Sequence, residues 1–489
     1  MTHDRPMMEK LPRVSPVTMM AEVKDVDIGD ERLNNRFMEI MGALASSPGS
    51  SFAGLFSKES AVEATYRFMR NPSVDWEDLL EPHLEETAHR CEEAGSVIII
   101  HDTTTHRVPD DADLESYINT GKKGFLAHAS LAVRENGDCR PLGLLGMQCV
   151  FRKKRRAKTK KKGRALSGAE TAKLKNKEFD RWAKGVDSSS ERLGEGVDAI
   201  HATDREGDSF GFFARLDTDH DSFVIRECKN RSARLAGDDS DEWSKIHELL
   251  DKAKRTRIRR KIHVGKRRKK TAPGAAKANP ARAARSACLK VAYVTLELRK
   301  PLYLKTAPDC PESLKLNVVH VYEVNPPEGE ERIEWVLLTN LPVGNAVEAE
   351  RVVDIYLRRW LIEEFFAALK GGCAYRKRHL TNRFSILNTL AALAPVAWKA
   401  LDLRELARSA RSPADEAFGS LEIEALRAKA RKMGSPLSRK PSAQEALHLI
   451  ARMGGHRKSS GPPGWRTLMK GMDRFLGIAE GYALARANL

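Results

Sequence analysis

The sequence has too few cysteines, in the wrong places, for a disulfide-bonded or zinc-finger protein. Its seven cysteines are scattered and contain no C-x-x-C pair, a usage typical of reduced, mostly buried thiols. No apolar run approaches the roughly 20 residues that a membrane span needs. Residues 1–13 contain no hydrophobic stretch of signal-peptide type. We therefore expect a cytoplasmic protein with no zinc site of ordinary spacing and no membrane segment.

Acidic charge is also in short supply. The 489 residues contain 84 Lys and Arg against 67 Asp and Glu, so the net charge is +17. Lys and Arg that neutralise phosphates release condensed counterions, so this balance favours a nucleic-acid partner, although ribosome-associated and membrane-surface proteins share it. Hydrophobic residues make up 41% of the chain, as in globular proteins. The length predicts two to four domains.

The first 75 residues are predicted to form a small helical module, because their apolar residues recur at helical spacing. Ser60 and Glu63 have the spacing of a capping box ahead of a short helix. Ser73 is the predicted N-cap of the helix that follows. Arg67 and Arg70 lie on the short helix. They indicate either a solvated basic face or a helix that docks on DNA, and this segment alone favours neither.

A β-rich pattern follows, in the order strand, strand, strand, helix, strand, helix, strand. This is the layout of a ribonuclease-H-like sheet, in which the first and fourth strands lie side by side and parallel. The first strand ends at Asp102 and the fourth at Asp204, so we expect their carboxylates to be neighbours at the carboxyl ends of the strands. The segments are predicted at residues 97–102, 125–134, 139–151, 168–185, 197–203, 208–216 and 222–228.

Residues 229–345 interrupt this alternation and are predicted to be a mostly β insertion. They contain a polar helix, a very basic segment and three strands, predicted at 241–254, 252–270, and 289–297, 316–324 and 333–340, respectively. Two long helices, at 347–370 and 385–402, come next. The last 85 residues are also predicted to be helical, with a capping box at Ser442 and Glu445.

The helix at 347–370 offers a third acid. At 100° per residue, Tyr356, Arg359, Glu363 and Lys370 fall within about 60° of arc on one face, whereas Glu364 points about 100° away from Glu363. Taken by itself, this stripe fits an amphipathic helix with ordinary ion pairs. Because the helix follows two strand-end acids in the appropriate fold order, we predict that Glu363 joins them in one site.

Three such carboxylates suit two-metal phosphoryl transfer, in which two divalent ions lie roughly 4 Å apart. One ion lowers the pKa of the attacking water or sugar hydroxyl, and the other stabilises the leaving oxygen. Arginine and lysine on the same helix face would bind phosphates nearby and position the scissile bond.

At this point the residues resemble a known family. The segment that begins at Tyr356 resembles the Y-(2)-R-(3)-E-(6)-K signature of the insertion-sequence-four group of DDE transposases. The strand that ends in Ile100-His-Asp102 resembles the first-acid strand of that group, and Thr203-Asp204-Arg-Glu-Gly-Asp resembles its D-R-E-x-D motif. Residues 64–72 resemble its N-terminal end-binding domain. The resemblance covers nearly the whole chain, more weakly in the last 85 residues.

The resemblance implies a cut-and-paste DNA transposase with a triad of Asp102, Asp204 and Glu363 that holds two Mg²⁺ or Mn²⁺ ions. It also implies a hairpin intermediate: water frees a 3′ hydroxyl, the hydroxyl attacks the opposite strand, the hairpin is reopened, and the 3′ end joins target DNA. The implied partners are double-stranded DNA, both transposon inverted-repeat ends and target, and a second copy of the chain in a homodimer.

Further residues match the family's DNA contacts. The resemblance implies that Tyr356, Arg359 and Lys370 contact transposon-end phosphates. Trp335 and Trp360 match tryptophans that hold a flipped base, and base–aromatic stacking is worth ~1–3 kcal/mol. Core packing is the alternative reading for each tryptophan.

The implied domains are a transposon-end-binding domain that includes Arg67 and Arg70, a ribonuclease-H-like catalytic domain with the β insertion, and a helical dimerisation domain. They span 1–75, 76–403 and 404–489. Two basic runs depart from the family pattern. Residues 152–164 hold ten basic residues and 252–270 hold twelve, and neither run holds an acid. A surface loop and an added contact to the DNA backbone are the two readings.

Three rival functions remain. A catalytically silent DNA-binding protein would not need the three acids. Another ribonuclease-H-fold nuclease would cut nucleic acid without strand transfer, but it would not need the Y-R-E-K helix. A basic structural or nucleoid protein would keep its function after Asp102→Ala.

Overall fold

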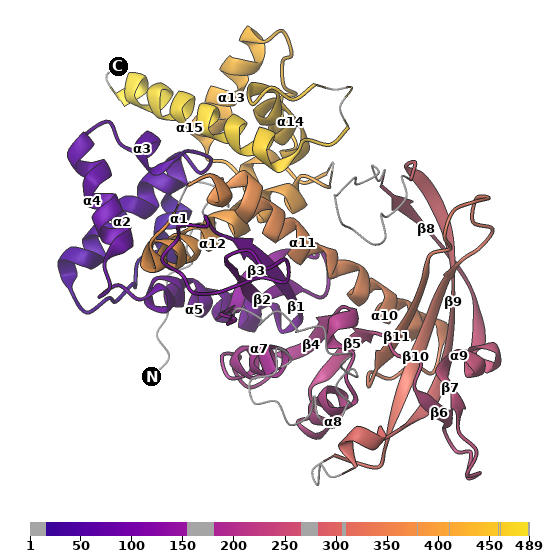
Figure 1. The fold of residues 1–489 in the computed structure, drawn as a ribbon. Helices are drawn as coiled ribbons and strands as arrows, with labels where there is room; N and C mark the ends of the chain where they lie inside the picture. Colours follow the sequence, from indigo (N-terminus) through magenta and orange to yellow (C-terminus); the bar gives the residue numbers. More distant parts are fainter. Residues whose placement is uncertain are drawn as a thin grey trace, which may run out of the picture.

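The computed structural model describes residues 16–153, 180–265, 282–305, 310–378, 380–409, 411–457, 459 and 461–487. Helices cluster at the two ends of the chain, and a large sheet lies between them in the sequence (Figure 1). The described helices are α1 (Pro16–Val23), α2 (Glu31–Ser46), α3 (Phe52–Leu55), α4 (Glu59–Arg70), α5 (Trp76–Ala94), α7 (Asp180–Ser190), α8 (Phe210–Thr218), α9 (Ile246–Leu249), α10 (Ala346–Arg358), α11 (Trp360–Ala367), α12 (Arg383–Leu406), α13 (Ser420–Lys432), α14 (Ala443–Met453) and α15 (Trp465–Ala487).

The described strands form one mixed sheet in the order β3-β2-β1-β4-β5-β11-β10-β9-β6-β7, and β8 also pairs with β9. Strands β1, β4 and β5 are parallel to one another, and the other pairings are antiparallel. The strands are β1 (Ser96–Arg107), β2 (Gly124–Arg134), β3 (Pro141–Val150), β4 (Asp198–Thr203), β5 (Ser222–Arg226), β6 (Ser232–Leu235), β7 (Ser244–Lys245), β8 (Lys254–Val264), β9 (Arg285–Arg299), β10 (Ser313–Glu323) and β11 (Glu334–Thr339).

The predicted order of five strands and two helices is confirmed, as is the parallel pairing of the first and fourth strands. The first strand is longer than predicted, because three β-branched threonines continue its pairing with β2 as far as Arg107. Asp102 therefore lies inside β1 and not at its end. Of the helix predicted at 168–185, residues 168–179 lie outside the described residues, and α7 begins at Asp180.

The β-rich character predicted for residues 229–345 is confirmed, but these strands extend the same sheet through the β5–β11 pairing. The polar helix predicted at 241–254 is wrong. Only Ile246–Leu249 forms an α-helical turn, followed by a 3-10 turn, and the chain enters β8 at Lys254. Strand pairing at both ends of the predicted helix limits its length, because Ser244 and Lys245 pair with β6 and Lys254 pairs with β9.

The helix predicted at 347–370 is divided at Arg359. The Arg359 N–H donates to the Tyr356 carbonyl, three residues back, so the turn tightens between α10 and α11. After α11 a π-helical turn, η4 (Ala368–Gly372), carries Lys370 and ends at the predicted glycine pair.

Two helix caps predicted near the start of the chain are wrong, and the capping box predicted near its end is confirmed. Helix α4 follows Lys58 without a side-chain cap, so Ser60 and Glu63 form no capping box there. The N-cap of α5 is Asp75, whose carboxylate accepts the Glu77 N–H, and not Ser73. The capping box of Ser442 and Glu445 does begin α14.

Apolar packing holds the N-terminal helices to the sheet. One core cluster includes residues of α1, α2 and α4, of β1, β2 and β4, and of α10 to α15. Helix α12 lies at its centre, against α1, α2, α4, α5 and β3. This helix is long and apolar enough to cross a membrane, but 94% of its most apolar window is buried inside the protein, as in the core helix of a globular fold.

Candidate active site

Two parallel strands bring the first two predicted acids to the same end of the sheet. In the register of β1 with β4, Ile100 is paired with Ala202, and each predicted acid lies two residues further along its own strand. Asp102 stays in β1, and its carboxylate accepts the Thr103 N–H at 2.7 Å. Asp204 follows β4 and caps the 3-10 turn η1 (Arg205–Gly207), where it accepts the Glu206 N–H at 2.8 Å.

The Asp102 carboxyl has an unusual environment. Burial raises its pKa, Arg359 opposes that rise, and the negative charges of Asp204 and Glu363 add to it, so that the pKa reaches about 7. Asp204 and Glu363 are thus both close enough to Asp102 to act on it electrostatically. Burial among like charges is a frequent property of functional acids.

The third predicted acid, Glu363, comes from helix α11. The Arg359 guanidinium contacts both Asp102 and Glu363, with Nη1–Oδ2 and Nη1–Oε1 distances of 3.4 and 3.7 Å. The Glu363 side chain is 45% exposed. Glu364 turns toward the C-terminal helices instead, where its carboxylate accepts the Trp465 indole N–H at 2.9 Å and pairs with Arg404. The preference for Glu363 over Glu364 therefore agrees with where the two side chains lie.

Lys370 lies against the end of β1. Its ammonium donates to the Thr104 hydroxyl and, at 2.9 Å, to the Thr105 carbonyl. Burial and the positive charge of Arg376 lower its pKa to about 8, although the negative charges of Glu363 and Asp102 oppose the shift. Lys370 is thus held beside the acids as a cation that gives up its proton more easily than an exposed lysine.

The donor chemistry of the three acids fits a hard divalent cation such as Mg²⁺ or Mn²⁺, which prefers carboxylate oxygens. The pKa of Asp102 is raised chiefly by burial and further by the negative charges of Asp204 and Glu363, and a bound cation would offset both effects. Among the described residues, no three His, Cys, Asp or Glu side chains are arranged so that they could hold a metal ion together. In this arrangement the Arg359 guanidinium supplies the positive charge that contacts Asp102 and Glu363.

A charged pocket adjoins the acids. It has a volume of 570 Å³, and its wall includes Trp335, four arginines and four glutamates: Arg205, Arg226, Arg282, Arg332, Glu227, Glu330, Glu331 and Glu334. Because Arg205 directly follows Asp204, the pocket begins next to the second acid. The arginines and glutamates balance in charge, so the wall is not cationic as a whole, but its indole can stack a base. Arg226 could not be predicted as part of this pocket from the sequence, because it lies on β5, far from Trp335 in the chain.

The predicted DNA-contacting residues of α10 and α11 differ in exposure. Tyr356 is buried, its ring packs on Trp335 at 5.5 Å between centroids, and its hydroxyl accepts from Arg226 at 3.5 Å. Trp360, in contrast, is 59% exposed, which is unusual for so large an apolar side chain. The core-packing alternative is therefore excluded for Trp360.

Arg67 and Arg70 lie in the last turn of α4, and both are exposed. The buried residues of this helix, Thr65, Phe68 and Met69, face the core instead. The two arginines are thus available to a partner, and Figure 1 shows α4 on the opposite side of the molecule from β8 to β11.

The two basic runs have different outcomes. Of residues 152–164, only Arg152 and Lys153 lie within the described residues. The second run forms β8, in which Arg259, Lys261 and His263 are exposed and Arg260 pairs with Asp354 of α10. This part of the second run is therefore an edge strand and not a loop.

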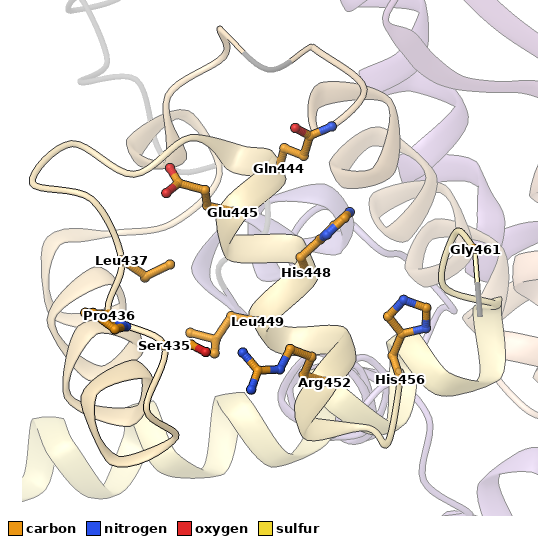
Figure 2. Close-up of a pocket in the computed structure, with 10 residues that line it drawn as sticks. All are labelled: Ser435, Pro436, Leu437, Gln444, Glu445, His448, Leu449, Arg452, His456 and Gly461. Atoms are coloured by element: carbon orange, nitrogen blue, oxygen red, sulfur yellow. The ribbon is translucent and has the colours of Figure 1, made fainter. Parts of the chain in front are cut away.

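A pocket of 490 Å³ lies apart from these residues, in the C-terminal helices (Figure 2). Gln444, His448 and Arg452 line it from α14, and His456 follows that helix. None of the predicted site residues lines this pocket: neither Trp335 and Trp360 nor Asp102, Asp204 and Glu363.

Residues 19–74 match the family of transposase DNA-binding domains. The match includes α2 to α4 and most of α1, and therefore includes Arg67 and Arg70. It indicates a transposase that has DNA as a partner, and it supports the predicted role of the N-terminal helices. Asp102, Asp204 and Glu363 all lie outside the matched residues.

Proposed function

We propose that this chain is a cut-and-paste DNA transposase of the insertion-sequence-four group, with Asp102, Asp204 and Glu363 as its catalytic acids. One observation carries the proposal: Arg359 contacts Asp102 and Glu363, and Asp204 is near enough to Asp102 to raise its pKa, in a chain that has a transposase DNA-binding segment. The strand order β3-β2-β1-β4-β5, with helices before and after β4, supports a ribonuclease-H-like core.

The proposed division of labour follows from the positions of the side chains. The three carboxylates would hold two Mg²⁺ or Mn²⁺ ions, which supply Lewis-acid activation of the attacking and leaving oxygens when bound. Arg359 contacts Asp102 and Glu363. We propose that its guanidinium turns to the phosphate of the scissile strand when DNA binds, because a guanidinium matches phosphate oxygens in a bidentate manner. Lys370 is positioned to contact a neighbouring phosphate.

Two aromatic residues suit a hairpin pathway. Trp335 lines the charged pocket next to Asp204, and Trp360 is exposed on α11. A hairpin requires the terminal base pair to open, and stacking of the extruded base on an indole offsets ~1–3 kcal/mol of that cost. The Tyr356 ring packs against the Trp335 ring. We propose a homodimer in the synaptic complex, with its contact on the C-terminal helices.

The test is metal-dependent cleavage of a duplex that carries the element's own terminal repeat, followed on strand-resolving gels. Asp102→Ala and Asp204→Ala are expected to abolish nicking, hairpin formation and strand transfer while end binding in a mobility-shift assay is retained. Asp110→Ala, an exposed acid beyond the end of β1, is the matched control and should cleave normally. Cleavage that persists in Asp102→Ala would exclude the proposed triad, and cleavage without strand transfer would favour a nuclease.

A further inference from the structure

Arg181 lies in the first turn of α7, on the face of the sheet opposite to Arg359. The helix packs against β1, β2 and β3. Only 9% of the Arg181 side chain is exposed. A nearly buried guanidinium must find hydrogen-bond acceptors, since leaving a buried charge unpaired is costly.

The Arg181 guanidinium donates in two directions. Its Nε donates to the Thr103 hydroxyl at 2.8 Å, and its Nη2 donates to the Glu206 carboxylate, also at 2.8 Å. Thr103 belongs to β1 and Glu206 to η1, so one side chain joins the two segments that carry the first two predicted acids. The rigid planar fork of arginine suits such a bridge better than a lysine would.

The two residues that Arg181 contacts also hold the acids themselves. The Thr103 N–H donates to the Asp102 carboxylate at 2.7 Å, and the Glu206 N–H donates to the Asp204 carboxylate at 2.8 Å. Each acid is therefore fixed by the backbone of a residue whose side chain is bound by Arg181. Arg181 therefore links the two carboxylates through two short, matching paths.

Buried histidines lie next to the hydrogen bonds that Arg181 makes. The Thr103 hydroxyl accepts from Arg181, which leaves its own proton for His128 Nδ1 at 2.9 Å. Burial, and secondarily the charge of Arg181, lowers the pKa of His128 to about 3, so the ring is neutral and can accept. His101 joins β2 to β4 through Ser130 and His201, at 2.9 and 2.8 Å.

Helix α7 is seated closely on these histidines. A Cβ added at Gly185 would lie 2.8 Å from His128 Nε2 and 3.2 Å from His101 Nδ1. Glycine at this position therefore allows α7 to approach the sheet closely enough for Arg181 to reach Thr103. The hydrogen bonds of Arg181 to Thr103 and Glu206 therefore depend on this tertiary contact.

We propose that Arg181 is a positioning residue that sets the distance between Asp102 and Asp204 and so preorganises the site for divalent metal. The inference rests on the proposed function, because it takes these two carboxylates as metal ligands. Residues that orient metal ligands typically change metal affinity by about 10- to 100-fold when they are replaced. Arg181 touches neither metal nor DNA in this role.

The sign of the effect separates positioning from simple electrostatics. Arginine is a cation near a cation site, so a purely electrostatic role predicts tighter metal binding when its charge is removed. A positioning role predicts weaker binding, since the two carboxylates lose their fixed separation. We therefore expect the affinity for the divalent metal to be highest in the unmodified protein, lower in Arg181→Lys and lowest in Arg181→Met.

The experiment is a Mn²⁺ titration of the full-length protein without DNA, followed by electron paramagnetic resonance, with Asp102→Asn to identify the signal of this site. We expect Arg181→Met to raise the dissociation constant at least about tenfold. Glu206→Gln, whose side chain is 61% exposed and hence tolerant of change, should raise it less because one arm of the bridge is retained. Arg215→Met is the matched control, since Arg215 pairs with Asp187 of α7 but reaches neither acid.

The outcomes distinguish this inference from the proposed function. Unchanged or tighter Mn²⁺ binding in Arg181→Met, together with an unchanged Glu206→Gln, overturns the positioning role while wild-type cleavage leaves the transposase proposal intact. Weaker binding in both variants supports positioning even if the unmodified protein does not cleave DNA. A wild-type protein without an Asp102-dependent Mn²⁺ signal overturns the inference directly. Equal weakening in Arg215→Met would assign the effect to loss of α7 packing and also overturn it.

Discussion

The N-terminal helices and the acid-bearing end of the sheet differ in how they display their charges. Arg67 and Arg70 are exposed on α4, in a segment whose role is indicated by similarity to transposase DNA-binding domains. Asp102 and Lys370 are largely withdrawn from solvent, and both have shifted pKa values. Binding to a polyanion needs accessible cations, whereas chemistry needs groups whose protonation is tuned by burial.

These two regions are nevertheless joined rigidly. Glu22 of α1 is buried and bound by His83 and Arg90 of α5, with closest distances of 2.6 and 2.7 Å. His83 in turn accepts the Leu144 N–H of β3, and Arg90 donates to the Leu142 carbonyl. DNA held by the N-terminal helices would therefore have a fixed orientation relative to the sheet. The comparison implies that DNA holding and chemistry are separable functions within one rigid unit.

The largest effect is expected at α11, where two adjacent glutamates serve different regions. Glu363→Ala should reduce cleavage by at least about 10³-fold, because a metal-held carboxylate supplies several kcal/mol of transition-state stabilisation. Its melting temperature should change little. Glu364→Ala should retain cleavage and lower the melting temperature, since Glu364 holds Trp465 and Arg404. The measurements are initial cleavage rates and thermal melting, and the reverse pattern would exchange the assignments of the two glutamates.

The junction between the two regions should be the next most sensitive position. Glu22→Ala leaves Arg90 and His83 without their buried partner, which typically costs ~3–5 kcal/mol of unfolding free energy. Burial opposes ionisation of Glu22, but Arg90 and His83 hold its pKa below the usual range. The stabilisation is therefore present at neutral pH and is lost as the carboxyl is protonated in acid. Urea unfolding at pH 7 and in acid should show the Glu22→Ala difference shrinking, whereas Glu39→Ala, an exposed acid of α2, should show little difference at either pH.

Metal affinity should depend on pH through Asp102, whose pKa is about 7 in the metal-free protein. Below pH 7 a divalent ion must displace a proton, so Mn²⁺ affinity should rise about tenfold per pH unit from pH 5 to pH 7 and then level off. The free energy of unfolding of the metal-free protein depends on pH in the opposite direction. A raised carboxyl pKa contributes stability at low pH that is lost as pH rises through 7, so Asp102→Asn should raise the melting temperature of the metal-free protein more at pH 8 than at pH 5. A flat Mn²⁺ affinity between pH 5 and pH 7 would contradict a site that depends on Asp102.

The smallest effects should come from the phosphate contacts. A double Arg67→Ala, Arg70→Ala variant should reduce the slope of log binding constant against log salt by about 2, and Lys370→Ala by about 1. The N-terminal double variant should cleave normally once protein concentration saturates the DNA, but Lys370→Ala should remain impaired because Lys370 lies beside the acids. Salt-dependent binding and cleavage at saturation separate the two. Equal recovery of both variants would indicate that Lys370 only contributes affinity.

Local patterns in the sequence were sufficient for several parts of this protein. Alternating and helical periodicities predicted the order of the first five strands and their helices, and with it the parallel neighbours β1 and β4. The arc of side chains on the helix after residue 346 separated Glu363 from Glu364. The Ser442 capping box was predictable because its hydrogen bonds span only three residues.

Contacts between distant segments decided the rest. Pairing with β2 extended β1 past Asp102, and pairing with β9 turned a basic segment into β8. Burial next to Arg359 and two other carboxylates set the pKa of Asp102. The Arg181 bridge joins residues 78 and 25 positions away in the chain. Periodicity records which face of an element is buried but not what lies against that face. The acids could therefore be proposed from the sequence, whereas the surroundings that tune and position them required the tertiary structure.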